Sequence, residues 1–139
     1  MKTSTEPDWA ALVAAARAAA ARAYAPYSKY RVGAALLAAD GTVFAGCNVE
    51  SASYGLTNCA ERTALFKAVS EGRRDFAALA IAGGTAASPA LPCGACRQAL
   101  AEFCGPDLPV AVAPLRGGRA VVRTLGDYLP FSFALERGE

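Results

Sequence analysis

Residues 76–84 read F-A-A-L-A-I-A-G-G, a run without a single polar side chain. Short apolar runs of this kind are typical of strands buried in a parallel sheet or at the centre of a sheet. The chain has 139 residues, of which 54% are hydrophobic, so it is long enough for one real core and too short for two domains of ordinary size. We therefore predict a single domain over residues 1–139, in which this run is a buried strand.

Helices and strands alternate along the rest of the chain. Residues 8–24 are rich in alanine and predict a helix with Asp8 as N-cap and Pro26 as the stop. The pair Asp40-Gly41 is the turn signal of a hairpin between two apolar strands. Five strands with helices between them predict an α/β fold, a three-layer α/β/α sandwich with a mixed five-stranded sheet. The hairpin strands are expected over 31–39 and 42–49, the last two strands over 108–115 and 120–124, and the other helices over 58–71, 94–104 and 125–130.

Charge and hydropathy argue against several classes of partner. The net charge of +2 comes from 14 basic and 12 acidic residues spread along the chain, without a basic run that could follow a phosphate backbone. No apolar stretch approaches the roughly 20 residues that a bilayer span needs, and the N-terminus lacks the apolar core of a signal peptide. We therefore expect a cytoplasmic protein that binds neither nucleic acid nor membranes.

The five cysteines are the main candidates for chemistry in a chain that has no histidine. An odd number in a reducing compartment favours metal binding or catalysis over structural disulfides. The motifs C-A-E and P-C-G-A-C each stand at the start of a predicted helix, where free backbone N–H groups and the helix dipole lower the pKa of a thiol. We predict that three thiolates, those of Cys59, Cys93 and Cys96, bind one zinc ion per subunit.

Glu61 stands two positions after Cys59, near the predicted metal without having to ligate it. Three protein ligands leave the fourth position of a tetrahedral zinc site open, as catalytic sites do. Zinc lowers the pKa of a bound water from about 15.7 to about 7–9, and a neighbouring carboxylate could take that proton and deliver it to a substrate. Zinc with such a glutamate is the arrangement of base deaminases, so we predict hydrolytic deamination with Glu61 as the proton shuttle.

Each motif also has a simpler explanation. Asn58 and Glu61 fit a capping box, in which the carboxylate only satisfies a backbone donor. The C-x-x-C pair alone would fit a redox dithiol. Cys47 or Cys104 could complete a structural zinc site with four thiolates, although an apolar strand and a helix end are positions typical of small core residues. A structural zinc-binding module therefore stays open as an alternative to an enzyme.

Four motifs in order resemble the small, homotetrameric cytidine deaminases, and the resemblance covers nearly the whole chain. They are A-P-Y-S-K-Y-R-V-G-A-A-L, G-C-N-V-E-S-A-S-Y-G, C-A-E-R-T-A-L and P-C-G-A-C-R-Q. The resemblance implies the cytidine deaminase fold and the zinc-dependent conversion of cytidine and deoxycytidine to uridine and deoxyuridine, with release of ammonia, in pyrimidine salvage. Ser51, Leu91 and Tyr30 depart from the family pattern. Another aminopyrimidine nucleoside, such as a blasticidin-like one, is therefore the alternative substrate, although the N-V-E motif argues against it.

The resemblance also implies how a nucleoside is held. Asn48 and Glu50 would bind the ribose hydroxyls. Tyr30 and Phe133 would flank the pyrimidine, and the backbone at Ala60 would contact the base.

Four more residues complete the predicted site. By the same resemblance, Ala52 and Tyr54 would approach from a neighbouring subunit of a homotetramer. Three thiolates would leave a Zn²⁺ centre with a net negative charge, which weakens it as a Lewis acid. Arg62 and Arg97 come shortly after predicted ligands, and we predict that hydrogen bonds from both to thiolate sulfur offset this charge.

Overall fold

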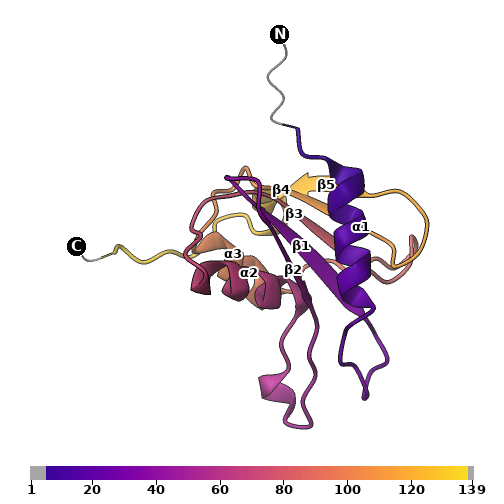
Figure 1. Cartoon of the computed structure of the whole chain (residues 1–139). Coiled ribbons are helices and arrows are strands. Elements are labelled where there is room, and N and C mark those ends of the chain that lie inside the picture. Colours follow the sequence, from indigo (N-terminus) through magenta and orange to yellow (C-terminus); the bar gives the residue numbers. More distant parts are fainter. Residues whose placement is uncertain (1–5, 138–139) are drawn as a thin grey trace.

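Helices cover both faces of a five-stranded sheet in the computed structural model, which describes residues 6–137 (Figure 1). The spatial order of the strands is β2-β1-β3-β4-β5. Only the β3–β4 pair among them is parallel, so the sheet is mixed, as predicted. The strands are β1 (Val32–Ala38), β2 (Val43–Cys47), β3 (Phe76–Gly83), β4 (Pro109–Ala113) and β5 (Val121–Thr124).

The helices divide between the two faces of the sheet and confirm the predicted three-layer arrangement. Helix α1 (Trp9–Ala20) lies on one face, and α2 (Ala60–Ser70) and α3 (Gly94–Ala101) lie on the other (Figure 1). A 3-10 turn, η1 (Tyr54–Leu56), interrupts the segment between β2 and α2, and the short helix α4 (Leu125–Tyr128) follows β5. None of the helices in the described part of the chain is long and apolar enough to cross a membrane.

The two faces of the sheet carry side chains of different size, because successive residues of a strand point to opposite sides. The side that meets α1 is built of alanines, and we call it the alanine face: Ala35, Ala78, Ala80, Ala82, Ala111 and Ala113. The side that meets α2 and α3 is built of larger side chains, and we call it the branched face: Leu36, Leu79, Ile81, Val110 and Val112. Both sets are buried and together form the core.

Helix α1 ends earlier than its sequence predicts. The alanine tract is helical and Asp8 caps it, accepting a hydrogen bond from the backbone N–H of Ala11 at 3.1 Å. The helix stops at Ala20, however, and not at Pro26. The reason is tertiary, since Tyr24 leaves the helix to exchange backbone hydrogen bonds with the segment after β2, donating to Asn48 O at 3.0 Å and accepting from Glu50 N at 2.9 Å.

Candidate active site

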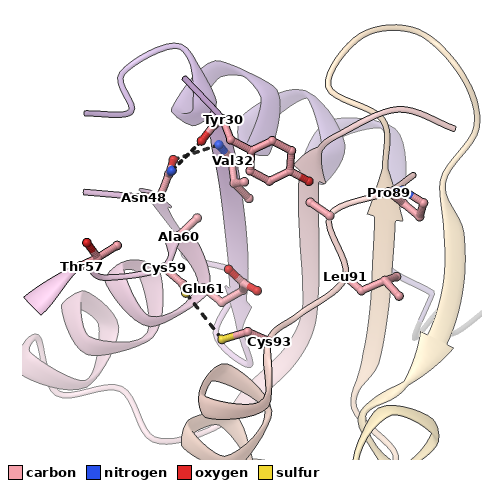
Figure 2. Close-up of a pocket in the computed structure, with 11 residues that line it drawn as sticks. Tyr30, Val32, Asn48, Thr57, Cys59, Ala60, Glu61, Pro89, Leu91 and Cys93 are labelled. Atoms are coloured by element: carbon pink, nitrogen blue, oxygen red, sulfur yellow. Dashed lines mark hydrogen bonds between the residues drawn. The ribbon is translucent and has the colours of Figure 1, made fainter. Parts of the chain in front are cut away.

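Three thiols converge where α2 and α3 begin. The Sγ atoms of Cys59, Cys93 and Cys96 lie within 4.8 Å of one another, and those of Cys59 and Cys93 are 3.6 Å apart and point toward each other (Figure 2). A tetrahedral centre with metal–sulfur bonds of about 2.3 Å places its sulfurs roughly 3.8 Å apart, so the spacing fits a zinc ion. Within residues 6–137, this is the one group of metal-binding side chains close enough to share an ion.

The backbone at the two helix starts explains why the thiols meet. Cys59 is the N-cap of α2 and Cys93 the N-cap of α3, and both have extended backbone angles. The N–H of Cys96 in the first turn of α3 donates to Cys93 Sγ at 3.4 Å. The start of α2 is fixed by Asn58, whose backbone exchanges hydrogen bonds of 2.9 Å with Val49 in both directions. The two helix starts thus bring their thiols to the same place.

The other two cysteines are not part of this group. Cys104 packs against the hydrophobic core below the branched face, and burial raises its pKa to about 12. Cys47 stands opposite Gly33 in the β1–β2 ladder and lines a groove beside α1. The structure therefore brings together the three cysteines predicted as ligands and leaves out both candidates for a fourth.

Charge around the sulfurs is balanced by one arginine. Arg62 Nη2 donates to Cys59 Sγ at 3.3 Å, as predicted for this residue. The hydrogen bond from the Cys96 thiol, followed by that from Arg62, lowers the pKa of Cys59 to about 5 against the opposing effect of burial. The same Cys59–Cys96 hydrogen bond, together with burial, raises the pKa of Cys96. The pKa shifts of Cys59 and Cys96 thus have opposite directions and share one cause, the hydrogen bond between the two thiols.

Glu61 is a buried carboxyl beside the thiols, with only 4% of its surface exposed. Burial raises its pKa to about 7, and the charge of Cys59 acts in the same direction. The capping-box explanation is wrong, because Cys59 and not Asn58 is the N-cap of α2. The Asn58 side chain donates instead to Thr63 Oγ1 at 3.0 Å. A carboxyl that titrates near neutral pH is suited to give and take protons.

A cavity of about 330 Å³ opens above Glu61, Cys59 and Cys93. Figure 2 shows Glu61 pointing into it from the start of α2, with Tyr30 and Leu91 on its other walls. Its size is in the range of small-molecule sites, and its lining is mostly apolar with a few polar groups. The cavity thus combines space for a small ligand with a buried carboxyl and two of the three clustered thiols.

Residues 8–112 match the sequence family described as cytidine and deoxycytidylate deaminase zinc-binding region. The cytidine deaminase of Sporosarcina psychrophila is 52% identical over 125 residues, which are 90% of this chain and 90% of that protein. This chain belongs to the cytidine deaminase family. The cytidine deaminase of Mycobacterium tuberculosis (strain H37Rv) is 46% identical over 129 residues, 93% of this chain and 92% of the relative. The crystal structure of cytidine deaminase from Burkholderia pseudomallei, with 54% identity, gives a TM-score of 0.84 over 89% of this chain and 98% of that one.

Membership in the family confirms the resemblance that was drawn from the four motifs, and the solved structures confirm the fold. The zinc-binding region and the cluster of three thiols together fit one zinc ion per chain, as predicted.

Three of the residues predicted to contact the nucleoside line the cavity, namely Tyr30, Asn48 and Ala60. The Asn48 amide is fixed at both ends, since Oδ1 accepts from Val32 N at 2.9 Å and Nδ2 donates to Tyr30 O at 2.7 Å (Figure 2). An amide has two donor hydrogens and two acceptor lone pairs, so one of each is still free for a ligand. Thr57 also lines the cavity, but nothing in its sequence context marked it.

Glu50 lies in an adjoining cavity of about 240 Å³ that also contains Tyr54 and shares Thr57 with the first one. Its carboxylate accepts hydrogen bonds from the backbone N–H of Tyr27 at 3.0 Å and of Ser28 at 3.2 Å, and from the Ser28 hydroxyl. These bonds, that of the Ser28 hydroxyl first, lower the pKa of Glu50. Asn48 thus lines the first cavity and Glu50 lines the adjoining one.

The remaining predicted contacts do not reach the cavity of their own chain. Ala52 and Tyr54 lie on the segment between β2 and α2 that projects from the body of the molecule, and Tyr54 is 78% exposed (Figure 1). Phe133 lies on the extended C-terminal segment and is 66% exposed, and its carbonyl accepts a hydrogen bond from Gln98.

The predicted hydrogen bond from Arg97 to thiolate sulfur is not found within the described part of the chain. Its Nε donates to Pro92 O at 2.6 Å and its Nη1 to Tyr128 O at 2.7 Å, so these two nitrogens bind backbone carbonyls and not the predicted thiolate sulfur. The difference is tertiary, because the ring and the carbonyl of Tyr128 in α4 hold the guanidinium.

Proposed function

We propose that this protein is a zinc-dependent deaminase that hydrolyses cytidine and deoxycytidine to uridine and deoxyuridine and releases ammonia. The observation that carries the proposal is a cluster of three thiols beside one buried carboxyl, of which Cys59, Cys93 and Glu61 line a single cavity and Cys96 is buried behind them. The names of the similar proteins and structures support the same reaction. The reaction would serve pyrimidine salvage in the cytoplasm, carried out by a single domain.

Cys59, Cys93 and Cys96 would hold the zinc ion. Thiolates are soft ligands that suit zinc, and the sulfur spacing fits a tetrahedral centre. A zinc ion bound there supplies a water whose pKa is lowered into the neutral range. Arg62 would offset the negative charge that three thiolates place on the centre, through its hydrogen bond to Cys59.

Glu61 would move the protons of the reaction. Its carboxyl is buried in the cavity wall beside Cys59, where its pKa of about 7 allows it both to accept and to release a proton at neutral pH. Glu61 would take a proton from the attacking water and give it to ring nitrogen N3 of the cytosine, which makes C4 more electrophilic, while the oxygen of that water bonds to C4. Glu61 would then take the remaining proton of this oxygen and pass it to the amino group, so that the C4–N bond breaks, ammonia leaves and C4 becomes a carbonyl.

The cavity would hold the pyrimidine between apolar walls and bind the sugar at its edge. Tyr30 and Leu91 line the space above Glu61, and the backbone at Ala60 is next to it. The free donor and acceptor of Asn48 would meet a ribose hydroxyl. Glu50 would bind a ribose hydroxyl from the adjoining cavity, where its carboxylate is held in its charged form by Ser28 and Tyr27.

We also propose a homotetramer in which neighbouring subunits complete each site. Tyr54 and Phe133 are large exposed side chains, and neither lines the cavity beside the thiols, although Tyr54 borders the adjoining one. Tyr54 borders one cavity with exposed Tyr27 and shares the η1 turn with exposed Leu56, and contiguous exposed apolar side chains are typical of surfaces that bind another protein, here a second copy. Ala52 would approach a neighbouring site with Tyr54. Sedimentation equilibrium of the wild-type protein and of Tyr54→Ala tests this, and a wild-type protein with the mass of one chain would contradict it.

The decisive test of the activity is turnover with a matched pair of variants. Purified protein with its zinc content measured is given cytidine or deoxycytidine, and the ultraviolet change and ammonia are followed. We expect Glu61→Gln to lose at least about 100-fold in kcat, because a general acid–base group contributes about that much or more. Glu71→Gln at the exposed end of the same helix should turn over like the wild type.

A folded protein with one zinc per chain and no turnover of either nucleoside would contradict the proposal. Turnover of a modified aminopyrimidine nucleoside in its place would point to a blasticidin-like substrate. Metal without turnover of any nucleoside would leave a structural zinc-binding module.

A further inference from the structure

Arg97 makes three contacts, with two segments that are far from each other in the sequence. Its Nε donates to the carbonyl of Pro92 at 2.6 Å, and its Nη1 donates to the carbonyl of Tyr128 at 2.7 Å. Its guanidinium also lies over the Tyr128 ring, 5.2 Å from the centroid. One side chain therefore connects the residue before Cys93 to the last residue of α4.

The contact with Pro92 acts on the direction of Cys93. A peptide unit is planar, so the carbonyl oxygen of Pro92 and the backbone nitrogen of Cys93 belong to one rigid group. The hydrogen bond from Arg97 to this oxygen therefore fixes the orientation of the whole Pro92–Cys93 peptide plane, and with it the position of the Cys93 nitrogen and Cα. Cys93 itself is exposed, so packing alone holds its side chain less firmly than that of buried Cys96.

The contact with Tyr128 gives Arg97 a rigid partner. Helix α4 begins with a capping box between Thr124 and Asp127, and Leu125 and Tyr128 are part of the buried core. The Tyr128 carbonyl is at the C-terminal end of the helix, where carbonyls lack a partner within the helix. The Tyr128 hydroxyl is buried and has no hydrogen-bond partner within the described residues, so the ring face and the carbonyl are the parts that bind Arg97.

We propose that Arg97 is a positioning residue for the metal centre, which connects the Pro92–Cys93 peptide to α4 and so holds the Cys93 thiol in place beside Cys59. The inference rests on the proposed function, in which Cys93 is a zinc ligand. Arg97 differs in this from Arg62, which contacts sulfur directly. Loss of Arg62 changes the charge at the centre, whereas loss of Arg97 changes the position of one ligand.

The chain offers a matched control in Arg73. This residue also lies over an aromatic ring, with its guanidinium 5.5 Å from the Phe44 centroid, and it also donates to a backbone carbonyl, that of Glu71 at 3.2 Å. It forms a salt bridge of 3.1 Å with Asp40, near the turn of the β1–β2 hairpin. Its ring and carbonyl contacts are of the same kinds as those of Arg97, with the salt bridge in addition, but they lie at the β1–β2 hairpin and the C-terminal end of α2 and not at the helix starts that carry the thiols.

The experiment measures how firmly the full-length chain binds Co²⁺, which takes the same thiolate ligands and is coloured. Affinity is measured by competition with a chelator, and the tetrahedral ligand-field bands report geometry. We expect Arg97→Gln to bind Co²⁺ about 10- to 100-fold more weakly and with weaker tetrahedral bands, the range found when groups that orient metal ligands are removed. Arg97→Lys, which keeps the charge but not the paired geometry, should lie between this variant and the wild type.

Two controls separate positioning from a general loss of stability. Arg73→Gln should bind Co²⁺ within about twofold of the wild type, even where its metal-free form melts as low as that of Arg97→Gln. Tyr128→Phe should also bind normally, because the hydroxyl that it removes has no partner.

Wild-type affinity and bands in Arg97→Gln would overturn the inference, as would an equal loss of affinity in Arg73→Gln. If Arg97→Gln does not fold, Arg97→Lys decides in the same way, and wild-type affinity in that variant overturns the inference. A wild-type chain that binds no Co²⁺ would overturn the proposed metal site itself, and the role of Arg97 with it.

Discussion

The alanine face and the branched face of the sheet are buried by different kinds of contact. On the alanine face, the backbone of α1 lies directly against the strands, and a Cβ atom at Gly33 would be only 1.8 Å from the carbonyl oxygen of Ala16. On the branched face, leucine, isoleucine and valine side chains fill the space between the sheet and α2, α3 and α4. At strand β1 the contact with α1 is thus a close backbone approach, whereas the inner strands meet the helices of the other side through side-chain volume. At Gly46 of the edge strand β2, however, α2 also comes close to the backbone.

The difference matters because the candidate site lies on the side of the branched face. Cys59 and Glu61 are carried by α2, and Cys93 and Cys96 by α3. Large side chains fill the space between these helices and the inner strands, and the cavity of about 330 Å³ opens beside the starts of the helices. Beside α1, by contrast, the groove of about 340 Å³ contains Cys47 but none of the three clustered thiols.

The largest effect is expected where the backbones are closest. Gly33→Ala should lower the free energy of unfolding by more than about 3 kcal/mol, the upper range for overpacking. The new Cβ would meet Ala16 O at 1.8 Å and Ala20 N at 2.5 Å, and backbone atoms of a helix cannot rotate away. Urea unfolding measures the loss. Gly105→Ala, where no atom lies within 4 Å of the new Cβ, should stay within about 0.5 kcal/mol of the wild type.

Equal stability of Gly33→Ala and the wild type would show that α1 does not lie against the sheet as described, and the contrast between the faces would disappear.

The next largest effect is expected on the branched face. Leu79→Ala should cost about 3 kcal/mol, because it removes a fully buried side chain and leaves a cavity. Ala80→Gly, the next residue on the opposite face, should cost only about 1 kcal/mol, since it loses one methyl group and gains backbone freedom. Urea unfolding of both variants gives the comparison. A larger loss of stability for Ala80→Gly than for Leu79→Ala would mean that the side-chain volume of the branched face contributes less to stability than the close packing of the alanine face.

Much of this architecture could be predicted from the sequence, but the contrast between the faces could not. The apolar run 76–84 indicated a buried central strand, and β3 indeed lies between β1 and β4. Within that run, Leu79 and Ile81 point to one face and Ala78, Ala80 and Ala82 to the other. Because all of these residues are apolar, hydrophobic periodicity alone does not say which side receives which helix.

In the candidate site, too, features that depend on nearby residues could be predicted from the sequence, and features that depend on distant residues could not. The spacing of Cys59, Cys93 and Cys96 at helix starts was enough to predict their meeting, since the helix position of each thiol is local. The partners of Arg97 could not be predicted, because Tyr128 is 31 positions away in the sequence. The end of α1 at Ala20 likewise depends on tertiary contacts.

A smaller effect on stability is expected at Gly46, but with a consequence for the site. A Cβ there would lie 2.5 Å from Ala64 N and 2.9 Å from Ala60 O, both in the backbone of α2. Gly46→Ala should cost about 2 kcal/mol and move the start of α2, and with it Cys59. We expect a lower zinc affinity in the folded variant, measured by chelator competition. Gly33→Ala, compared under conditions where it is folded, should keep its zinc affinity, because it disturbs the opposite face.

A folded Gly46→Ala variant with wild-type zinc affinity would show that the start of α2 can shift without moving the metal ligands.

The smallest effect is expected at the two cysteines outside the cluster, one associated with each face. Cys104 packs against the core of the branched face, whereas Cys47 lies beside α1 at the edge of the sheet. Cys104→Ala should cost about 1 kcal/mol and Cys47→Ala less than about 0.5 kcal/mol, since each removes a single sulfur from a partly buried position. Both should keep one zinc per chain, measured by elemental analysis. Loss of zinc in either variant would mean that a fourth thiolate reaches the metal, and a centre closed in that way would have no position for the water that deamination requires.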